Sequence, residues 1–137
     1  MLQTISTGML DKTNRGTILI ADDDPIVVEA ISTILKNAGW AVVSAKNGRE
    51  ALETIYTRHI DALILDIRMP ELDGYEVCLN LLRRGKKIPT LVMTGCPDER
   101  QPLSYLNVSQ FMRKPVRSQD LLEFVDTVNS SIEVKSA

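Results

Sequence analysis

Short apolar runs alternate with longer segments of helical period along the chain from Thr17 onward. Runs that are apolar at consecutive positions are typical of parallel strands buried on both faces of a sheet. The expected strands are residues 18–21, 40–44, 62–65, 90–93 and 110–113. Strands that alternate with helices predict an α/β fold, in which right-handed crossovers place helices on both faces of one parallel sheet.

Capping residues mark the starts of the expected helices. Those residues are Asp24, Asn47, Asp73 and Ser118. Pro25 suits the first turn of the first helix, where no amide hydrogen is needed, and Gly39 is expected to end that helix. Glu50, three residues after Asn47, is expected to complete a capping box. The apolar stripe of this second helix is expected from Ala51, Leu52, Ile55 and Tyr56.

The 137 residues fit one compact domain with a sizeable core. Residues 1–16 are polar and aperiodic, so we expect a flexible N-terminal tail, a domain over residues 17–130 and a polar C-terminal tail over residues 131–137. Residues 96–109 contain Pro97 and Pro102 and fit the helical pattern least. Because proline disrupts a helix interior, we expect a short helix starting near Pro102 or an irregular stretch.

The composition argues against several functional classes. A net charge of −2 disfavours a direct nucleic-acid binder, which usually carries a basic patch. No apolar run approaches the roughly 18 residues of a membrane span, and the first residues lack the features of a signal peptide. We therefore expect a cytoplasmic protein without membrane insertion. Cys78, Cys96 and the one histidine are too few for a disulfide scaffold or a zinc site, so both thiols are expected to be reduced.

Polar side chains follow the expected strands at the points where the strands end. Asp22 and Asp23 follow the first strand, Asp66 the third, Thr94 the fourth and Lys114 the fifth. Because the carboxyl ends of parallel strands form the ligand crevice of an open α/β sheet, these side chains should meet at one edge. Clustered carboxylates repel one another unless one is protonated or a cation intervenes. Mg²⁺ is the expected cation, since it favours a few carboxylate oxygens together with water and phosphate.

The same side chains suit phosphoryl transfer. A carboxylate can act as a nucleophile and form an aspartyl phosphate. Lys114 and Mg²⁺ would then neutralise charge on the equatorial oxygens, while Thr94 would donate a hydrogen bond. Few residues suffice for this chemistry, because the protein mainly positions the phosphoryl group and neutralises its charge.

Four segments along the chain carry family motifs. They are residues 18–25 (ILIADDDP), 61–74 (DALILDIRMPELDG), 88–95 (IPTLVMTG) and 111–116 (FMRKPV). Together and in this order they resemble the receiver domain of the two-component response-regulator family. The resemblance implies a flavodoxin-like, doubly wound sheet of five parallel strands in the order 2-1-3-4-5. It also implies a cis peptide bond before Pro115.

The resemblance implies a role for each residue of the cluster. Asp66 would receive a phosphoryl group from a sensor histidine kinase or a histidine phosphotransfer protein. Mg²⁺ would be bound by Asp22, Asp23, Asp66 and the backbone carbonyl of Arg68. Thr94 and Lys114 would hold the phosphoryl group. Phe111 stands at the position of the family's switch aromatic, which turns inward as Thr94 moves toward the phosphoryl group.

The leading hypothesis is a single-domain response regulator, a phosphoacceptor signalling domain and not an enzyme. Only a short polar tail follows Asn129, so the signal is expected to pass through contacts with an effector protein. One departure from the family pattern concerns residues 107–110 (NVSQ), which stand in place of a common Gly-Ala pair. This departure puts the fourth helix, and with it the usual output face of the family, in question.

Two alternative functions stay open. The receiver fold could serve as a docking module that works without phosphorylation, which the altered fourth helix favours. A haloacid-dehalogenase-type phosphatase would use Asp22 as its nucleophile, because Asp22 and Asp24 form a D-x-D pattern after the first strand. Pro25 and the short chain argue against the phosphatase. Phe111 could equally be plain core packing, and Trp40 is expected to be half-buried packing.

Overall fold

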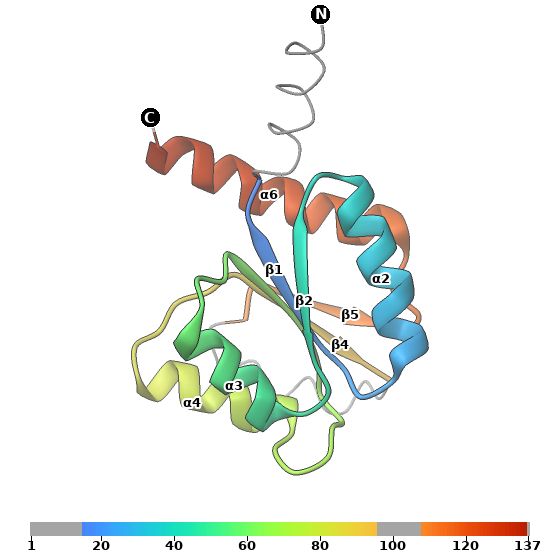
Figure 1. Ribbon diagram of the computed structural model, residues 1–137, viewed down its shortest axis with the longest axis vertical. Helices are drawn as coiled ribbons and strands as arrows, with labels where there is room; N and C mark the ends of the chain where they lie inside the picture. Colours follow the sequence, from blue (N-terminus) through green and yellow to red (C-terminus); the bar gives the residue numbers. More distant parts are fainter. Residues whose placement is uncertain (1–14, 96–107, 137) are drawn as a thin grey trace, which may run out of the picture.

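Parallel strands form one five-stranded sheet in the order β2-β1-β3-β4-β5 (Figure 1). The computed structural model describes residues 15–95 and 108–136 of the chain. The strands are β1 (Thr17–Ala21), β2 (Ala41–Ala45), β3 (Ala62–Asp66), β4 (Thr90–Thr94) and β5 (Gln110–Arg113). The order confirms the doubly wound, flavodoxin-like sheet that the resemblance implied. The expectations for residues 1–14 and 96–107 lie outside the described residues.

Helices cover both faces of the sheet (Figure 1). They are α2 (Pro25–Asn37), α3 (Gly48–Thr57), α4 (Gly74–Arg83) and α6 (Ser118–Ser136). Apolar side chains of α2 and α6 pack on one face, and those of α3 and α4 pack on the other. The fold therefore has three layers, with the sheet in the middle.

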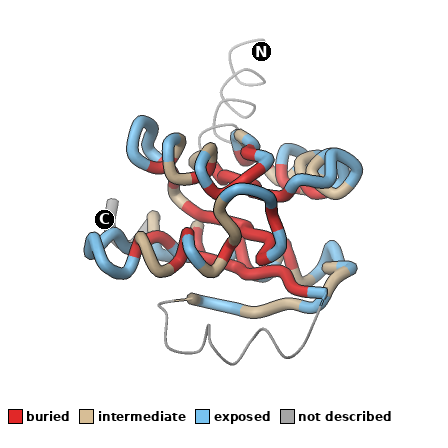
Figure 2. Tube along the Cα trace, turned by 90° about the horizontal axis from the view of Figure 1, so that it is seen from below, coloured by how far each residue is buried: buried red, intermediate tan, exposed pale blue. Residues whose placement is uncertain are grey.

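Alternate side chains of β1 enter opposite halves of the core. Ile18 and Ile20 belong to the apolar cluster beneath α2 and α6, whereas Leu19 and Ala21 belong to the cluster beneath α3 and α4. Figure 2 shows the central strands as a buried band between the helical layers. Each fully buried leucine or isoleucine stabilises the fold by about 1.5–3 kcal/mol relative to an exposed one. The core thus holds the strand ends, where the polar residues lie, in fixed positions.

The helices α2 and α4 begin directly after Asp24 and Asp73, the residues expected to cap them. The carboxylate of Asp24 accepts a hydrogen bond from the amide of Ile26 at 2.9 Å. Asp73 and Glu76 form a complete capping box, in which each side chain accepts from the backbone amide of the other residue. Such caps satisfy amides that have no partner within the helix.

Two other helix starts differ from the expectation. The Asn47 side chain caps α3 through the amide of Glu50 at 2.8 Å, but the Glu50 carboxylate accepts from Lys46 at 3.2 Å. The prediction of a capping box is therefore wrong for the second hydrogen bond. The Glu50 carboxylate accepts from the amide of Lys46, the residue before the cap, and not from the amide of Asn47. The expected cap Ser118 is the first residue of α6, since the carbonyl of Arg117 already accepts a helical hydrogen bond.

Trp40 belongs to the turn after α2, and the second strand begins one residue later than expected. The amide of Trp40 donates to the carbonyl of Leu35 at 3.1 Å, and Gly39, with φ of 96°, donates to Lys36 at 3.0 Å. These two bonds form a Schellman motif, which folds the chain back over the helix end. The Trp40 side chain is consequently only 3% exposed, so the expectation of half-buried packing is wrong.

Tyr56 lies at the surface of α3 instead of in its buried stripe. Its side chain is 41% exposed, and its hydroxyl donates to Asn80 of α4 at 3.0 Å. The guanidinium of Arg84 lies 5.1 Å from the centre of the Tyr56 ring. A buried tyrosine hydroxyl needs a polar partner, and here the partner on α4 lies at the surface. Ala51 and Ile55 are buried as expected.

The last helix, α6, continues to Ser136. The expected domain limits at residues 17 and 130 stay predictions, as does the cytoplasmic location. Among the residues that the structure describes, no helix has both the length and the hydrophobicity that a membrane crossing requires.

Cys78 is a buried free thiol on α4. Burial, and to a lesser extent the charge of Asp73, raises the pKa of the Cys78 thiol to about 12. Because the thiolate is the reactive form, this cysteine acts as a packing residue. Cys96 lies outside the described residues.

Candidate functional site

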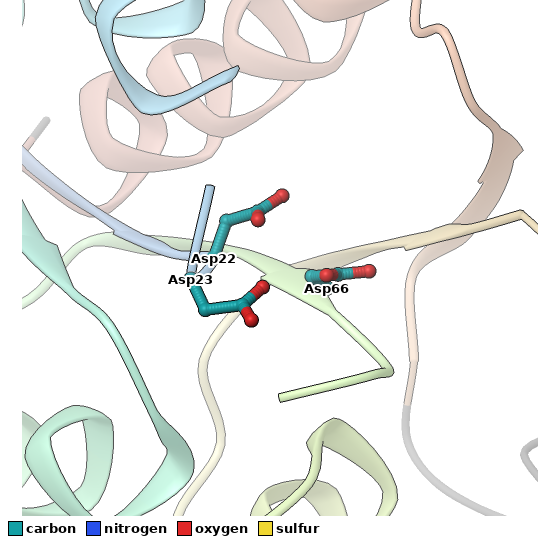
Figure 3. A group of neighbouring side chains, drawn as sticks. All are labelled: Asp22, Asp23 and Asp66. Carbon is teal, nitrogen blue, oxygen red and sulfur yellow. The ribbon is translucent and has the colours of Figure 1, made fainter. Parts of the chain in front are cut away.

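Three carboxylates gather where β1 and β3 end. Asp22 and Asp23 follow β1, and Asp66 is the last residue of β3. Each offers an oxygen, and these oxygens all lie within 4.8 Å of one another (Figure 3). Asp22 is 2% and Asp66 is 5% exposed, whereas Asp23 is exposed to solvent. The sheet therefore brings together the acidic residues that the strand pattern placed at one edge.

The backbone around Asp22 directs its carboxylate inward. One carboxylate oxygen accepts from the amide of Asp24 at 2.9 Å, which forms a tight turn. The amide of Asp22 donates to the carbonyl of Ala45, at the end of β2, at 3.0 Å. Asp24 itself caps α2 and is not part of the acidic cluster.

Lys114 contacts two of the three carboxylates. Its ammonium lies 2.9 Å from Asp22 Oδ2 and 3.2 Å from Asp66 Oδ2. The backbone amide of Lys114 donates to the carbonyl of Thr94 at 2.9 Å, which ties the residue to the end of β4. The structure thus brings Lys114 to Asp66 as predicted. Its bond to Asp22 was not predicted, because the strand pattern places both residues at one edge of the sheet but does not show which side chains pair.

Burial and nearby charges shift the pKa values of this pair. Burial of the Asp66 carboxyl and the negative charge of Asp22 raise the pKa of Asp66 above its ordinary value of 3.8, while Lys114 partly offsets the rise. Burial lowers the pKa of Lys114, but the hydrogen bond to Asp22 and the charges of both carboxylates outweigh this effect and raise it above 10.5. Lys114 is therefore a permanent cation between two crowded anions.

The remaining predicted residues are Thr94 at the end of β4, Arg68 in the loop after β3 and Phe111 within β5. Thr94 is the last residue of β4 and is 1% exposed. Arg68 lies two residues after Asp66, and its backbone makes a hydrogen bond to the Asp66 carboxylate. Phe111 lies in β5, partly buried, and packs against the apolar cluster beneath α3 and α4. The peptide bond between Lys114 and Pro115 is cis, as the resemblance implied.

A family model described as the response regulator receiver domain matches residues 18–126. The chain belongs to the response regulator receiver family. The match includes Asp22, Asp66, Thr94 and Lys114, so the cluster falls within the part of the chain that carries the family likeness. Receivers of this family are domains of two-component signalling systems.

Comparison with individual proteins agrees with this assignment. The receiver is 37% identical over 107 residues to the response regulator MprA of Mycolicibacterium vanbaalenii, and the match covers 77% of the chain and 46% of MprA. The chain thus spans about half the length of this relative. The crystal structure of a signal receiver domain of a histidine kinase from Syntrophus aciditrophicus superposes with a TM-score of 0.76 at 30% identity, covering 85% of this chain and 92% of that one. A chemotaxis protein from Vibrio cholerae superposes with a TM-score of 0.74 at 26% identity, covering 82% of this chain and 98% of that one.

Proposed function

We propose that this receiver is a Mg²⁺-dependent phosphoacceptor in which Asp66 takes a phosphoryl group from a histidine kinase or a histidine phosphotransfer protein. The observation that carries the proposal is the position of Lys114, whose ammonium contacts both Asp22 and Asp66 at the end of the sheet. The phosphorylated form would then signal through an effector protein. Family membership supports the proposal, because receivers are the signal-accepting domains of two-component systems.

The acidic cluster fits Mg²⁺. Its donors are all oxygens, the ligand type that Mg²⁺ prefers, and they gather within 4.8 Å of one another. Asp22, Asp23, Asp66 and the backbone carbonyl of Arg68 would hold the ion. When bound, Mg²⁺ supplies positive charge that offsets the repulsion between the carboxylates and the incoming phosphoryl oxygens.

The residues of the chain account for the rest of the transfer. A carboxylate oxygen of Asp66 forms the new bond to phosphorus, while the phosphorus–nitrogen bond of the donor phosphohistidine breaks and its electron pair stays on the imidazole. Lys114, which already lies 3.2 Å from Asp66, would neutralise an oxygen of the phosphoryl group. The hydroxyl of Thr94 would donate a hydrogen bond to another oxygen, and Phe111 would respond to the movement of Thr94.

Incubation with acetyl phosphate and Mg²⁺ tests the proposal directly. We expect the mass of the intact protein to rise by one phosphoryl group, and peptide mapping after borohydride reduction to place the modification at Asp66. Modification at Asp22 would instead support a haloacid-dehalogenase-type phosphatase. An unmodified protein would leave the phosphorylation-independent docking module as the better account.

The metal assignment is tested by two neighbouring substitutions, Asp23→Asn and Asp24→Asn. Mg²⁺ at a hundred times its dissociation constant should raise the free energy of unfolding of the wild type by about 2.7 kcal/mol. Asp23→Asn removes a predicted ligand, so the same Mg²⁺ concentration should give a much smaller rise. Asp24→Asn removes an equal charge one residue away but keeps the helix cap, because asparagine caps as well as aspartate.

Thermal unfolding with and without Mg²⁺ provides the measurement. The Asp24→Asn control should respond to Mg²⁺ as the wild type does, since Asp24 lies outside the acidic cluster. Equal responses of all three proteins would contradict the role of Asp23 as a ligand.

A further inference from the structure

The turn between β2 and α3, residues 45–48, contacts both segments that carry predicted metal ligands, although it offers no predicted ligand itself. On one side, the carbonyl of Ala45 accepts from the amide of Asp22 at 3.0 Å. This bond continues the parallel pairing of β1 and β2, in which Ala21 and Ala45 are partners. The β2–α3 turn is thereby fixed to the acidic segment after β1.

On its other side, the β2–α3 turn binds the loop between β3 and α4, residues 67–73. The amide of Gly48 donates to the carbonyl of Leu72 at 2.8 Å. The side-chain amide of Asn47 donates to the carboxylate of Glu71 at 3.0 Å, and Asn47 is only 8% exposed. Both bonds reach the β3–α4 loop a few residues after Asp66.

The contact at Gly48 leaves no space for a side chain. A Cβ atom at this position would lie 2.2 Å from the carbonyl oxygen of Leu72 and 2.8 Å from its Cβ atom. Separations under about 3 Å between such atoms are far below van der Waals contact, so a larger residue must push the two backbones apart. Glycine is needed here because of this close approach.

The β3–α4 loop is also held at its two ends. The amide of Gly74 donates to the carbonyl of Ile67 at 2.8 Å, and the backbone of Arg68 makes a hydrogen bond to the Asp66 carboxylate. Between these ends Glu71 has φ of 65°, a conformation that a non-glycine residue adopts only when its surroundings impose it. The bond from Asn47 is one such constraint.

We propose that the β2–α3 turn sets the distance between the two halves of the Mg²⁺ site, with Asn47 and Gly48 as positioning residues for the loop that carries Arg68. The turn joins Asp22 on one side to the β3–α4 loop on the other, so a displacement of the loop at Gly48 would move the Arg68 carbonyl away from Asp22. This inference rests on the proposed function, because it concerns the affinity of that same site for Mg²⁺.

Two substitutions test the positioning role by different means. Gly48→Ala introduces the clash with Leu72. Asn47→Ser keeps a hydroxyl that can cap α3 but removes the donor to Glu71. Loss of groups that orient metal ligands typically weakens metal binding by about 10- to 100-fold, and we expect each variant to raise the dissociation constant for Mg²⁺ by about tenfold. Isothermal titration calorimetry with Mg²⁺ alone measures this constant.

Gly85→Ala is the matched control. Gly85 has φ of +66°, so alanine is strained there, but among the described residues no atom apart from those of Gly85 and its chain neighbours lies within 4 Å of the added Cβ. This variant should unfold at a lower temperature in EDTA and yet bind Mg²⁺ as the wild type does. It therefore separates a general loss of stability from a loss of metal affinity.

The outcomes distinguish this inference from the function on which it rests. A wild type that binds no Mg²⁺ would overturn both. A wild type that binds Mg²⁺, together with Asn47→Ser and Gly48→Ala variants of unchanged affinity, would overturn the positioning role alone. Weaker Mg²⁺ binding by Asn47→Ser and Gly48→Ala, together with unchanged binding by Gly85→Ala, supports the positioning role. This holds even if the clash at Gly48 also lowers the unfolding temperature.

Discussion

Asp66→Asn should lower the rate of phosphorylation by acetyl phosphate by more than about a hundredfold, because removal of the nucleophile is among the largest single losses in group transfer. Asparagine has nearly the shape of aspartate but lacks the nucleophilic oxygen. Asp22 and Lys114 stay in place, so Mg²⁺ binding is weakened but the fold is kept. The measurement is the fraction of phosphorylated intact protein over time. A variant that is modified as fast as the wild type would contradict the assignment of Asp66.

The same substitution should stabilise the protein in the absence of Mg²⁺. The pKa of Asp66 is raised in the folded state, first by burial and then by Asp22, so the folded protein binds a proton more tightly than the unfolded chain. The ionised carboxylate therefore lowers stability, and this loss develops as the pH rises from the ordinary pKa of 3.8 through the raised value. The cost is fully present above the raised pKa, and Asp66→Asn removes it.

Thermal unfolding in EDTA over a range of pH checks this sign. The variant should unfold at a higher temperature than the wild type at neutral pH, and the difference should shrink as the pH falls toward 3.8. If the wild type is instead more stable than the variant at neutral pH, the attraction between Lys114 and the Asp66 carboxylate outweighs the cost of burying that carboxylate.

The position of the site could be predicted from the sequence because it depends on where strands end. A strand buried on both faces is apolar throughout, so its end is visible as the first polar residue, as at Asp22 and Asp66. Parallel strands place these ends at one edge of the sheet whatever the packing of the helices. The order of the strands was available only through the family resemblance.

Contacts between separate turns could not be predicted. The bond from Asn47 to Glu71 joins residues 24 positions apart, and both residues have other evident roles in the sequence, as a cap and as a loop residue. The requirement for glycine at position 48 likewise arises from the carbonyl of Leu72 and not from local backbone geometry. Hydrophobic periodicity assigns faces of helices, but it does not show which loops touch.

Amphipathic side chains were the other source of error. Tyr56 fits the apolar stripe of α3 by spacing, yet its hydroxyl donates to Asn80 at the surface. Trp40 follows a helix end, and its burial depends on a Schellman turn that the pattern of apolar residues does not encode. In both cases a hydrogen bond to another element decides the exposure.

Lys114→Met should destabilise the protein by about 3 kcal/mol and also lower phosphorylation by about 10²- to 10³-fold. The Asp22 side chain is 0% exposed, and without Lys114 its buried carboxylate would have lost the cation beside it, which lowers the free energy of unfolding. The expected loss of free energy lies at the lower end of the range for buried ion pairs, because the Lys114 side chain is 27% exposed. Because the pKa of Lys114 is raised in the folded protein, the stability that its charge contributes is fully present below pH 10.5 and is lost only at higher pH. Neutral pH is therefore a suitable condition for the measurement.

Lys87→Met is the matched control, since Lys87 is an exposed lysine ahead of β4 and its loss should change stability by less than about 0.5 kcal/mol. Urea unfolding in EDTA gives the stability, and acetyl phosphate gives the rate. Equal stability of the two variants would contradict the electrostatic role of Lys114. Asp66→Asn and Lys114→Met should thus slow the same reaction while moving stability in opposite directions, because one removes an excess anion from the cluster and the other removes the cation that balances it.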